Sequence, residues 1–282
     1  DDYRFGVFSS NYAKVQEHNK LQGRSFSLGL TSFAHLTHEE FAATHLGLKQ
    51  QIGAHATRKN ISDLPTDNIP KSVDWAPNMN AVKNQGQCGS CWAFSATGAL
   101  EGLNSVKFGD KTKLAEQDLV DCAGSYGNYG CNGGLMDNAF KYMIKSGGLA
   151  TEKDYPYTAA DGNCKKGVKR QGKITGYTDV KASNPEALKA AIAQQPVAVA
   201  IEADTSVFQS YRSGIISGSA CGTQLDHGVI AVGYDTTGRT PYYIVRNSWG
   251  PSWGDKGYVN LAIASGAGTC GIQMAASYPT AQ

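Results

Sequence analysis

The interpretation of this chain begins with the segment Gln85-Gly86-Gln87-Cys88-Gly89-Ser90-Cys91-Trp92-Ala93-Phe94. A Gly-rich turn ends at Cys91, and the apolar, Ala-rich stretch from Cys91 to Lys107 predicts a buried helix that begins at this cysteine. A helix N-terminus favours negative charge, so a thiol placed there ionises more readily than one at mid-helix. The backbone N–H groups of the first turn can also stabilise a developing oxyanion. The segment therefore indicates a nucleophilic cysteine.

Cysteines and histidines are distributed unevenly around this segment. All seven cysteines lie after residue 87, and in an oxidising compartment an odd number leaves one thiol unpaired and reactive. Seven reduced cysteines in a cytosolic protein are the alternative. Of the six histidines, His227 is the only one after residue 60, so it is the only imidazole available to an enzyme in the later part of the chain.

Composition excludes several classes of protein. The 282 residues carry 26 Lys+Arg and 24 Asp+Glu, a balance that does not suit binding of nucleic acid or acidic lipid by bulk charge. A hydrophobic content of 41% excludes a disordered chain, and no run of apolar residues is long enough to span a membrane. The start at Asp1 without Met and the acceptor triplet Asn60-Ile61-Ser62 fit a secreted precursor without its leader, or a trimmed chain.

Local patterns predict two unlike halves. Before residue 70 we expect a helix over 3–20, a short strand over 26–30 and a helix over 37–46, which has a T-x-x-E capping box and Gly47 as its stop. The polar, Pro-containing residues 49–70 predict a linker with a domain boundary. After Cys91 a helical part is followed by strand-like runs, listed as Pro196–Ile201, Gly228–Val232 and Tyr242–Arg246. This order predicts an α+β fold with two lobes.

Motifs along the chain carry a resemblance to a known family. C-G-S-C-W at 88–92, L-V-D-C at 119–122, G-C-N-G-G at 130–134 and N-S-W-G at 247–250 are similar to the papain-like cysteine peptidases. Residues 4–41 resemble the inhibitory propeptide of the cathepsin L branch, on the positions Arg4, Phe8, Asn11, Val15 and Asn19. The resemblance implies a two-lobed fold, with a helical lobe at about 80–180 and an antiparallel β-barrel lobe at about 181–277.

The resemblance also implies a precursor. Residues 1–67 would be an N-terminally truncated inhibitory propeptide with its linker, and residues 68–282 the mature cysteine endopeptidase. The propeptide would lie along the cleft in the non-productive direction, and acid-triggered cleavage would fall between about Thr57 and Ile69. We expect a monomer in the secretory pathway, in a lysosome or vacuole or outside the cell. It would act on proteins and peptides without nucleic acid, cofactor or metal.

Site residues follow from the same resemblance. Cys91 would be the nucleophile, His227 its proton partner and Asn247 the residue that orients the imidazole, while Gln85 would form an oxyanion hole with the Cys91 N–H. Positions that would contact substrate or line its main pocket are Gly133, Gly134, Leu135, Met136, Ala200, Leu225, Asp226, Gly228, Trp249 and Ala275. Because Ala275 is not acidic, we expect Leu, Phe or Val two residues before the cleaved bond. No His-rich insertion that would block the cleft is visible near 170–185, which favours an endopeptidase.

The family pattern implies the disulfides Cys88–Cys131, Cys122–Cys164 and Cys221–Cys270, with Cys91 free. Counting alone leaves about 15 pairings of six cysteines open. Other classes fit less well. For Cys88-x-x-Cys91 as a redox pair, the surrounding βαβ pattern is missing; a zinc site would need a second C-x-x-C; and a non-catalytic relative would not need all four catalytic positions intact.

One departure from the family suggests a pH sensor. His35 stands where the family propeptide usually has Asp, in Gly29-x-Thr31-x-Phe33-x-His35. Histidine titrates near pH 5–7, so its protonation could loosen the propeptide. Ordinary surface polarity is the alternative for all the early histidines.

Overall fold

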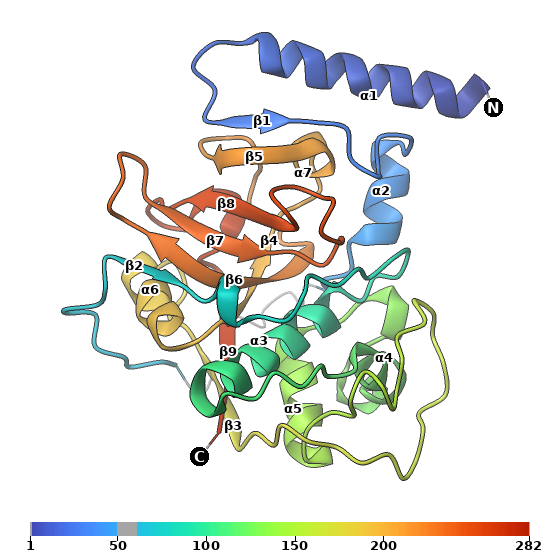
Figure 1. Cartoon of the computed structure of the whole chain (residues 1–282), viewed down its shortest axis with the longest axis vertical. Coiled ribbons are helices and arrows are strands. Elements are labelled where there is room, and N and C mark those ends of the chain that lie inside the picture. The colour runs from blue at the N-terminus through green and yellow to red at the C-terminus, as the bar shows by residue number, and fades with distance from the viewer. Residues whose placement is uncertain (1, 50–60, 282) are drawn as a thin grey trace.

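The computed structural model describes residues 2–49 and 61–281, and Figure 1 shows a helical layer beside a sheet, with α1 and β1 across the top and α2 at the right. The larger helices of the main body are α3 (Cys91–Phe108), α4 (Glu116–Cys122), α5 (Met136–Ser146) and α6 (Pro185–Gln194). Short helices are α7 (Ser206–Ser210), η2 (Ala76–Asn78), η3 (Gly124–Tyr126), η4 (Gly130–Asn132) and η5 (Thr269–Gly271). The α+β class predicted from the sequence is confirmed.

The sheet forms the second layer. Its strands are β1 (Phe26–Leu28), β2 (Ser72–Asp74), β3 (Gly176–Asp179), β4 (Val197–Ile201), β5 (Tyr211–Ile216), β6 (His227–Asp235), β7 (Tyr242–Arg246), β8 (Tyr258–Ala262) and β9 (Ala276–Thr280). Their order is β1-β5-β8-β7-β6-β4-β9-β3, with β2 on β6, and β5–β8 is parallel while the other pairs are antiparallel. Since β1 and β3 are the two ends of this order, the sheet is open and mixed, and the β5–β8 pair departs from the antiparallel pairing that we expected for the β lobe.

The central helix α3 is buried because it lies between the sheet and the helices α4 and α5. Its residues from Cys91 to Ser105 are all buried, as expected for a helix that is apolar around its whole circumference. Gly98 lets it approach the sheet, since a Cβ at this position would lie 2.1 Å from Cδ1 of Ile230. Ser95 Oγ donates to the Val229 carbonyl at 2.6 Å. These contacts bring the first turn of α3 beside the start of β6.

The first 49 residues fold as two helices and a strand. Helix α1 (Asp2–Lys20) crosses β1, where the Asn19 side chain bonds both backbone groups of Leu28 at 2.7 and 3.0 Å. Strand β1 pairs with β5 of the main body. Helix α2 (His38–His45) begins with the predicted capping box, in which Thr37 and Glu40 bond each other's backbone N–H. The helices predicted over 3–20 and 37–46 are confirmed within a residue or so.

The end of α2 differs from the prediction. Helix α2 ends through Leu46 in an extended conformation, and Gly47 does not have a left-handed backbone, so it is not the glycine stop that we predicted. Asn60 lies outside the described residues, as do residues 57–60 of the cleavage range 57–69 that we expected. No helix within 2–49 and 61–281 is long and apolar enough to cross a membrane.

Candidate active site

Cys91 is the first residue of α3 and has a free, buried thiol. The six other cysteines form the three pairs that the resemblance implied, Cys88–Cys131, Cys122–Cys164 and Cys221–Cys270. Because Cys88 is bonded to Cys131, Cys88 and Cys91 do not form a redox pair. The Cys88–Cys131 bridge instead fixes the loop that leads into α3.

His227 opens β6 on the other side of the cleft. Its Nε2 lies 2.8 Å from Oδ1 of Asn247, and this oxygen also accepts from the Ser248 N–H at 2.8 Å. With Asn247 as the acceptor, Nε2 carries the proton in the neutral ring, and Nδ1 is left buried without a hydrogen-bond partner. The Trp249 ring stacks on His227, with 4.6 Å between centroids.

The Gln85 side chain reaches the same place from the loop before α3. Ser248 Oγ donates to Gln85 Oε1 at 2.7 Å, which turns the amide nitrogen away from Ser248. Gln85 Nε2 donates to the carbonyls of Cys88 and His45, at 2.9 and 3.1 Å. The donor predicted for an oxyanion hole is therefore occupied by a carbonyl of the first 49 residues.

The extended segment after α2 runs through the cleft. The N–H groups of Gly47 and Leu48 donate to the Asp226 carbonyl at 3.2 and 2.9 Å. On the opposite wall Gly134 N–H donates to the Gly47 carbonyl at 2.9 Å, and Lys49 N–H donates to the Gly134 carbonyl at 3.1 Å. This is a parallel bridge between Leu48 and Gly134. Backbone groups expected to hold substrate are thus engaged by the chain itself.

Gly47 passes the site at very close range. A Cβ there would lie 2.1 Å from the Gly89 carbonyl oxygen, a distance that no real side chain could adopt. A Cβ on Gly133 would likewise lie 2.5 Å from the Gly47 oxygen. Glycine at position 47 is required by this passage and not by a turn, which is why local sequence patterns assigned it the wrong role.

The predicted pocket positions mostly come together. Met136, Ala200 and Leu225 belong to one buried apolar cluster of the helical layer, and Met274 and Ala275 pack against it. Leu48 packs against the same cluster. Gly228 adjoins it, because a Cβ there would lie 3.0 Å from Met136 Sδ, whereas Leu135 is outside it. Sequence reasoning missed Met274 and Leu48, although Met274 directly precedes Ala275.

Burial controls the charges of the catalytic pair in this covered state. It raises the pKa of the Cys91 thiol to about 12, against weaker hydrogen bonds from the backbone of Gly228, Trp92 and Gly47. Burial also lowers the pKa of His227 to about 4, although the bond to Asn247 opposes this shift. Both shifts favour the neutral thiol and the neutral imidazole. A thiolate–imidazolium pair is therefore not the favoured state while the cleft is covered.

Asp226, predicted as a substrate contact, forms one wall of the cleft. Its carboxylate accepts from the N–H groups of Ala203 and Asp204 at 2.8 and 3.2 Å. Burial nevertheless raises the pKa of this carboxyl to about 7. Its backbone carbonyl, described above, is the group that contacts the chain in the cleft.

His45 is a histidine that sequence reasoning did not single out. Its side chain is buried between Phe33 and Phe41, with ring centroids 4.5 and 5.6 Å away. Both phenylalanines meet the Trp249 ring edge to face, at 5.4 and 5.2 Å. Burial lowers the pKa of His45 to about 4. His35, the histidine that we favoured, is exposed.

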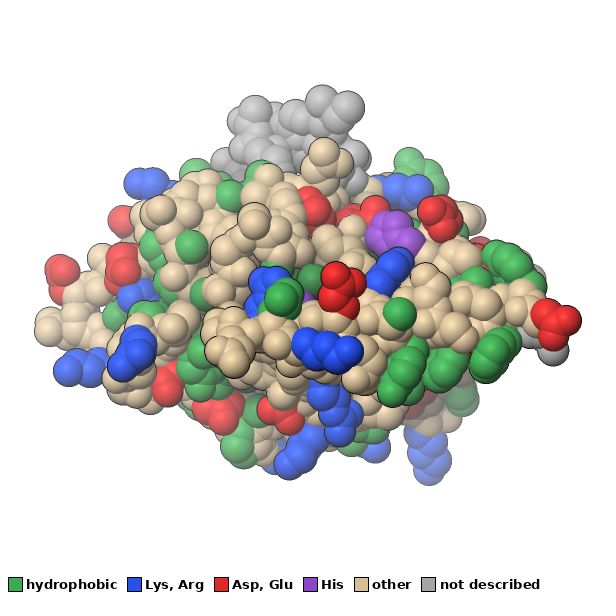
Figure 2. Space-filling model, turned by 90° about the horizontal axis from the view of Figure 1, so that it is seen from above, with side chains coloured by type: hydrophobic (Ala, Val, Ile, Leu, Met, Phe, Trp, Pro, Cys, Tyr) green, Lys and Arg blue, Asp and Glu red, His purple; other side chains and the backbone are tan. Residues whose placement is uncertain are grey.

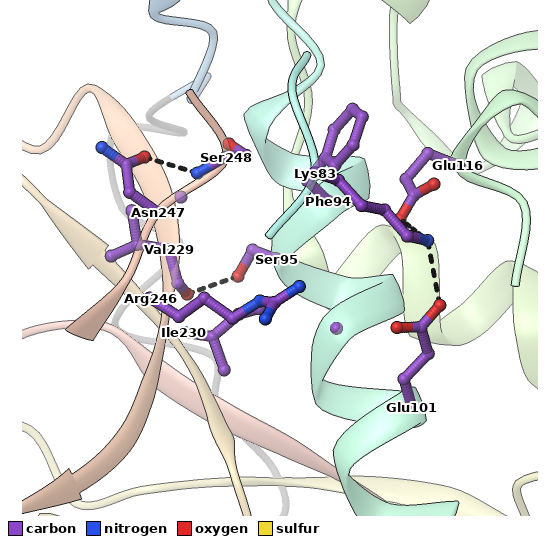
Figure 3. A pocket seen from close by; sticks show the side chains of 12 residues that line it. Lys83, Phe94, Ser95, Glu101, Glu116, Val229, Ile230, Arg246, Asn247 and Ser248 are labelled. Carbon is purple, nitrogen blue, oxygen red and sulfur yellow. Dashed lines mark hydrogen bonds and ion pairs between the residues drawn. The ribbon is translucent and has the colours of Figure 1, made fainter. Parts of the chain in front are cut away.

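Behind the catalytic pair lies a small polar cavity between the layers, drawn in Figure 3. Lys83 Nζ contacts Glu101 Oε1 and Glu116 Oε1 at 2.9 and 2.7 Å, and the Leu114 carbonyl at 2.9 Å. On the sheet side of the cavity, the Arg246 guanidinium donates to the backbone carbonyls of Asn80 and Ala81. The buried lysine is thus paired with two carboxylates, and the buried arginine is hydrogen-bonded to backbone carbonyls. Within the described residues no group of three or more metal-ligating side chains could hold a metal ion.

The chain belongs to the papain family of cysteine proteases. The family model "Papain family cysteine protease" matches residues 69–280, and the "Cathepsin propeptide inhibitor domain (I29)" model matches residues 1–41. We therefore call residues 2–49 the prosegment. This family confirms the resemblance stated from the sequence.

Relatives in this family are similar along nearly the whole chain. The cysteine proteinase RD21A of Arabidopsis thaliana is 50% identical over 99% of this chain, and cysteine proteinase COT44 of Brassica napus is 46% identical over 99%. The chain covers 61% of the former and 88% of the latter. Among solved structures, a recombinant stem bromelain precursor has a TM-score of 0.91 at 37% identity, covering 99% of this chain and 91% of that one. The Amb a 11 ragweed pollen allergen in its proform has 0.90 at 39%, covering 100% and 89%.

Proposed function

We propose that this chain is the latent precursor of a cysteine endopeptidase with Cys91 as nucleophile. The observation that carries the proposal is the free thiol at the start of α3, which accepts a hydrogen bond from the backbone of Gly228, the residue after His227, under a prosegment that bonds to Gln85. Residues 1–67 would be removed and 68–282 would act as a monomer on proteins and peptides. Three disulfides support maturation in the secretory pathway, in a vacuole or lysosome or outside the cell.

The chemistry begins when the prosegment leaves. Water then reaches the pair, and the burial that holds both groups neutral is removed. The proton of Cys91 Sγ moves to the unpartnered Nδ1 of His227, and the helix N-terminus stabilises the thiolate. Asn247 keeps the imidazolium in the plane required for proton transfer.

Peptide hydrolysis then proceeds in two steps. The thiolate attacks the peptide carbonyl, and the oxyanion accepts hydrogen bonds from Gln85 Nε2 and the Cys91 N–H. His227 protonates the leaving amine, so the C–N bond breaks and a thioester remains on Cys91. Water, deprotonated by His227, hydrolyses this thioester and regenerates the thiol.

We infer a preference for Leu, Phe or Val two residues before the cleaved bond. Met136, Ala200, Leu225 and Ala275 supply apolar or small walls, and Leu48 of the prosegment packs against the same cluster. Peptides that differ only in Leu or Arg at this position test the inference. Faster cleavage of the Leu peptide is expected, and faster cleavage of the Arg peptide would show that the pocket is wrongly assigned.

Acid activation is the second part of the proposal, and it depends on His45. The titratable groups near the His45 side chain are His35 in the prosegment and His227 on β6. A positive charge on His35 lowers the pKa of His45, and a positive charge on His45 lowers the pKa of His227. Thr44 Oγ1 donates to the Glu40 carbonyl, so it accepts from Nδ1 of a neutral His45, at 2.7 Å. Protonated His45 would be a cation between Phe33 and Phe41 with no ion pair among the described residues. Docking of the prosegment is therefore expected to weaken as pH falls.

One contact acts in the opposite direction. His38 Nε2 lies 2.7 Å from Asp204 Oδ1, an ion pair that exists only when His38 is protonated. Both side chains are about half exposed, so we expect this pair to oppose release only weakly. Incubation of the full chain at about pH 5, with N-terminal sequencing of any shortened product, tests activation. A Cys91→Ala variant that gives the same product would show that another protease performs the cleavage.

A further inference from the structure

The loop from Gln85 to Cys91 sets the distance between the two proposed oxyanion donors. On one side the Cys88–Cys131 disulfide and the Gly89 N–H, which donates to the Cys131 carbonyl at 2.9 Å, hold the middle of this loop. Neither contact reaches the two ends, at Gln85 and Ser90. Both ends instead meet the side chain of Tyr157.

Tyr157 connects these ends through its hydroxyl. Tyr157 Oη donates to the Gln85 carbonyl at 2.7 Å and lies 2.6 Å from Ser90 Oγ. A phenol has a single O–H, so the Ser90 hydroxyl is the donor in the second bond. The result is a directed chain from Ser90 through Tyr157 to the backbone of Gln85. Ser90 is the residue immediately before Cys91.

Tyr157 is itself held firmly in place. Its ring meets Phe94 of α3 edge to face, with 4.9 Å between centroids, and its N–H donates to Glu152 Oε1 at 3.1 Å. Burial raises the pKa of the phenol above its ordinary value, so the hydroxyl keeps its proton throughout the working range of the enzyme. The connection is therefore a rigid one that does not titrate.

We propose that Tyr157 is a positioning residue for the oxyanion site, whose hydroxyl fixes the spacing between the Gln85 amide and the Cys91 N–H. The inference rests on the proposed peptidase function. Tyr157 contacts neither substrate nor reacting atoms, and acts only through Gln85 and Ser90. Oxyanion donors must lie within about 2.7–3.1 Å of the developing charge, so a small shift of one loop end weakens transition-state stabilisation.

Tyr157→Phe removes the one oxygen and keeps the ring against Phe94. After removal of the prosegment, we expect kcat to fall about 10-fold, less than the loss of a whole oxyanion donor, while KM changes little. Binding of a peptide aldehyde should weaken by a similar factor, because its adduct places an oxyanion at the same donors. Alkylation of Cys91 by iodoacetamide forms no oxyanion, so its rate and pH profile should not change.

Tyr155→Phe is the matched control. Tyr155 lies in the same loop, and its hydroxyl donates to Asp121 Oδ2 at 2.7 Å, away from the segment that leads to Cys91. This variant should keep kcat and aldehyde affinity. Ser90→Ala breaks the same chain from its other end, so its loss and that of Tyr157→Phe should not add in the double variant.

Unchanged kcat and aldehyde affinity in Tyr157→Phe, or equal losses in Tyr155→Phe, would overturn the inference. Slower alkylation in Tyr157→Phe would also overturn it, because the residue would then act on the thiol and not on the oxyanion donors. A wild-type protein that cleaves no peptide after prosegment removal would instead contradict the proposed function. The aldehyde and alkylation measurements distinguish the two failures.

Discussion

The described part of the prosegment adds six buried residues to one apolar cluster and has no disulfide, whereas residues 69–281 contain three disulfides and most of the apolar clusters. Helix α1 buries only Val15, and Tyr3 and Phe5 on it are more than half exposed. Figure 2, which looks onto this face, shows charged side chains of both signs scattered among hydrophobic ones. A region without disulfides and with many exposed side chains can be released while the rest stays folded. We therefore expect the contacts of the prosegment to control its release, and the contacts within residues 69–281 to control the stability of the main body.

The largest effect is expected inside the main body, at Lys83. Lys83→Met leaves Glu101 and Glu116 adjacent and without their cation, and both are almost fully buried. We expect the free energy of unfolding to fall by about 3–5 kcal/mol, near the upper end because two carboxylates lose a partner. Urea unfolding measures it, with Lys189→Met at the partly exposed pair with Glu186 as control. Equal losses in both variants would contradict the assignment of a buried cluster.

A matched pair of phenylalanines sharpens the comparison directly. Phe41 in α2 and Phe140 in α5 are both 0% exposed. Truncation to Ala should remove about 3 kcal/mol or more in each case. In Phe140→Ala the loss should appear as a lower melting temperature of the main body. In Phe41→Ala it should appear as early release of the prosegment at neutral pH, seen by limited proteolysis, with the melting temperature of the body unchanged.

The pH response tests how the prosegment is released. The pKa of His45 is about 4 when docked and near 6.5 when free, so the undocked form binds more protons between these values. Stability of docking is therefore full above about pH 6.5 and falls as pH drops towards 4, by at most about 3 kcal/mol. His45→Phe should move the midpoint of release to lower pH, and His35→Phe should not. A shift in the His35 variant alone would restore our original interpretation.

The smallest effects are expected at helix caps. Thr37 caps α2 in the prosegment, and Asn184 caps α6 in the main body, each accepting a backbone N–H. Replacement by Ala should cost about 1 kcal/mol in either place. Thr37→Ala should raise the rate of prosegment release slightly, whereas Asn184→Ala should lower only the unfolding midpoint. The reverse pattern would mean that the two regions are not energetically separate.

Sequence patterns predicted several of the local elements well. Helices over 3–20 and 37–46 and the strand Tyr242–Arg246 follow from periodicity and capping, which are local properties. Cys91 and His227 could be singled out as candidates because a helix start and a single late histidine can be identified without knowing the fold. The parallel β5–β8 pair could not be predicted, since a strand's own residues do not specify its partner.

Burial was the part that local patterns could not provide. The local sequence does not show which of His35 and His45 is buried. In the structure, His45 packs against the rings of Phe33 and Phe41, and these rings contact Trp249. Gly47 has the pattern of a helix stop, and its real constraint is the Gly89 carbonyl from a distant loop. The neutral state of Cys91 and His227 also depends on their burial under the prosegment, which the local pattern around Cys91 does not show.

Strand β1 has a consequence for the enzyme once the prosegment is gone. It occupies one edge of β5, whose other edge is already taken by β8. Removal of β1 would leave a row of unpaired backbone N–H and C=O groups along the edge of β5. Such an edge can pair with another extended polypeptide. Gly214, at φ +91°, sits in that row where a Cβ would strike the Ser25 oxygen at 2.5 Å. A chain that pairs with this free edge of β5 must follow the same bent path as β1. The shape of the edge is therefore a lasting trace of the prosegment on the main body.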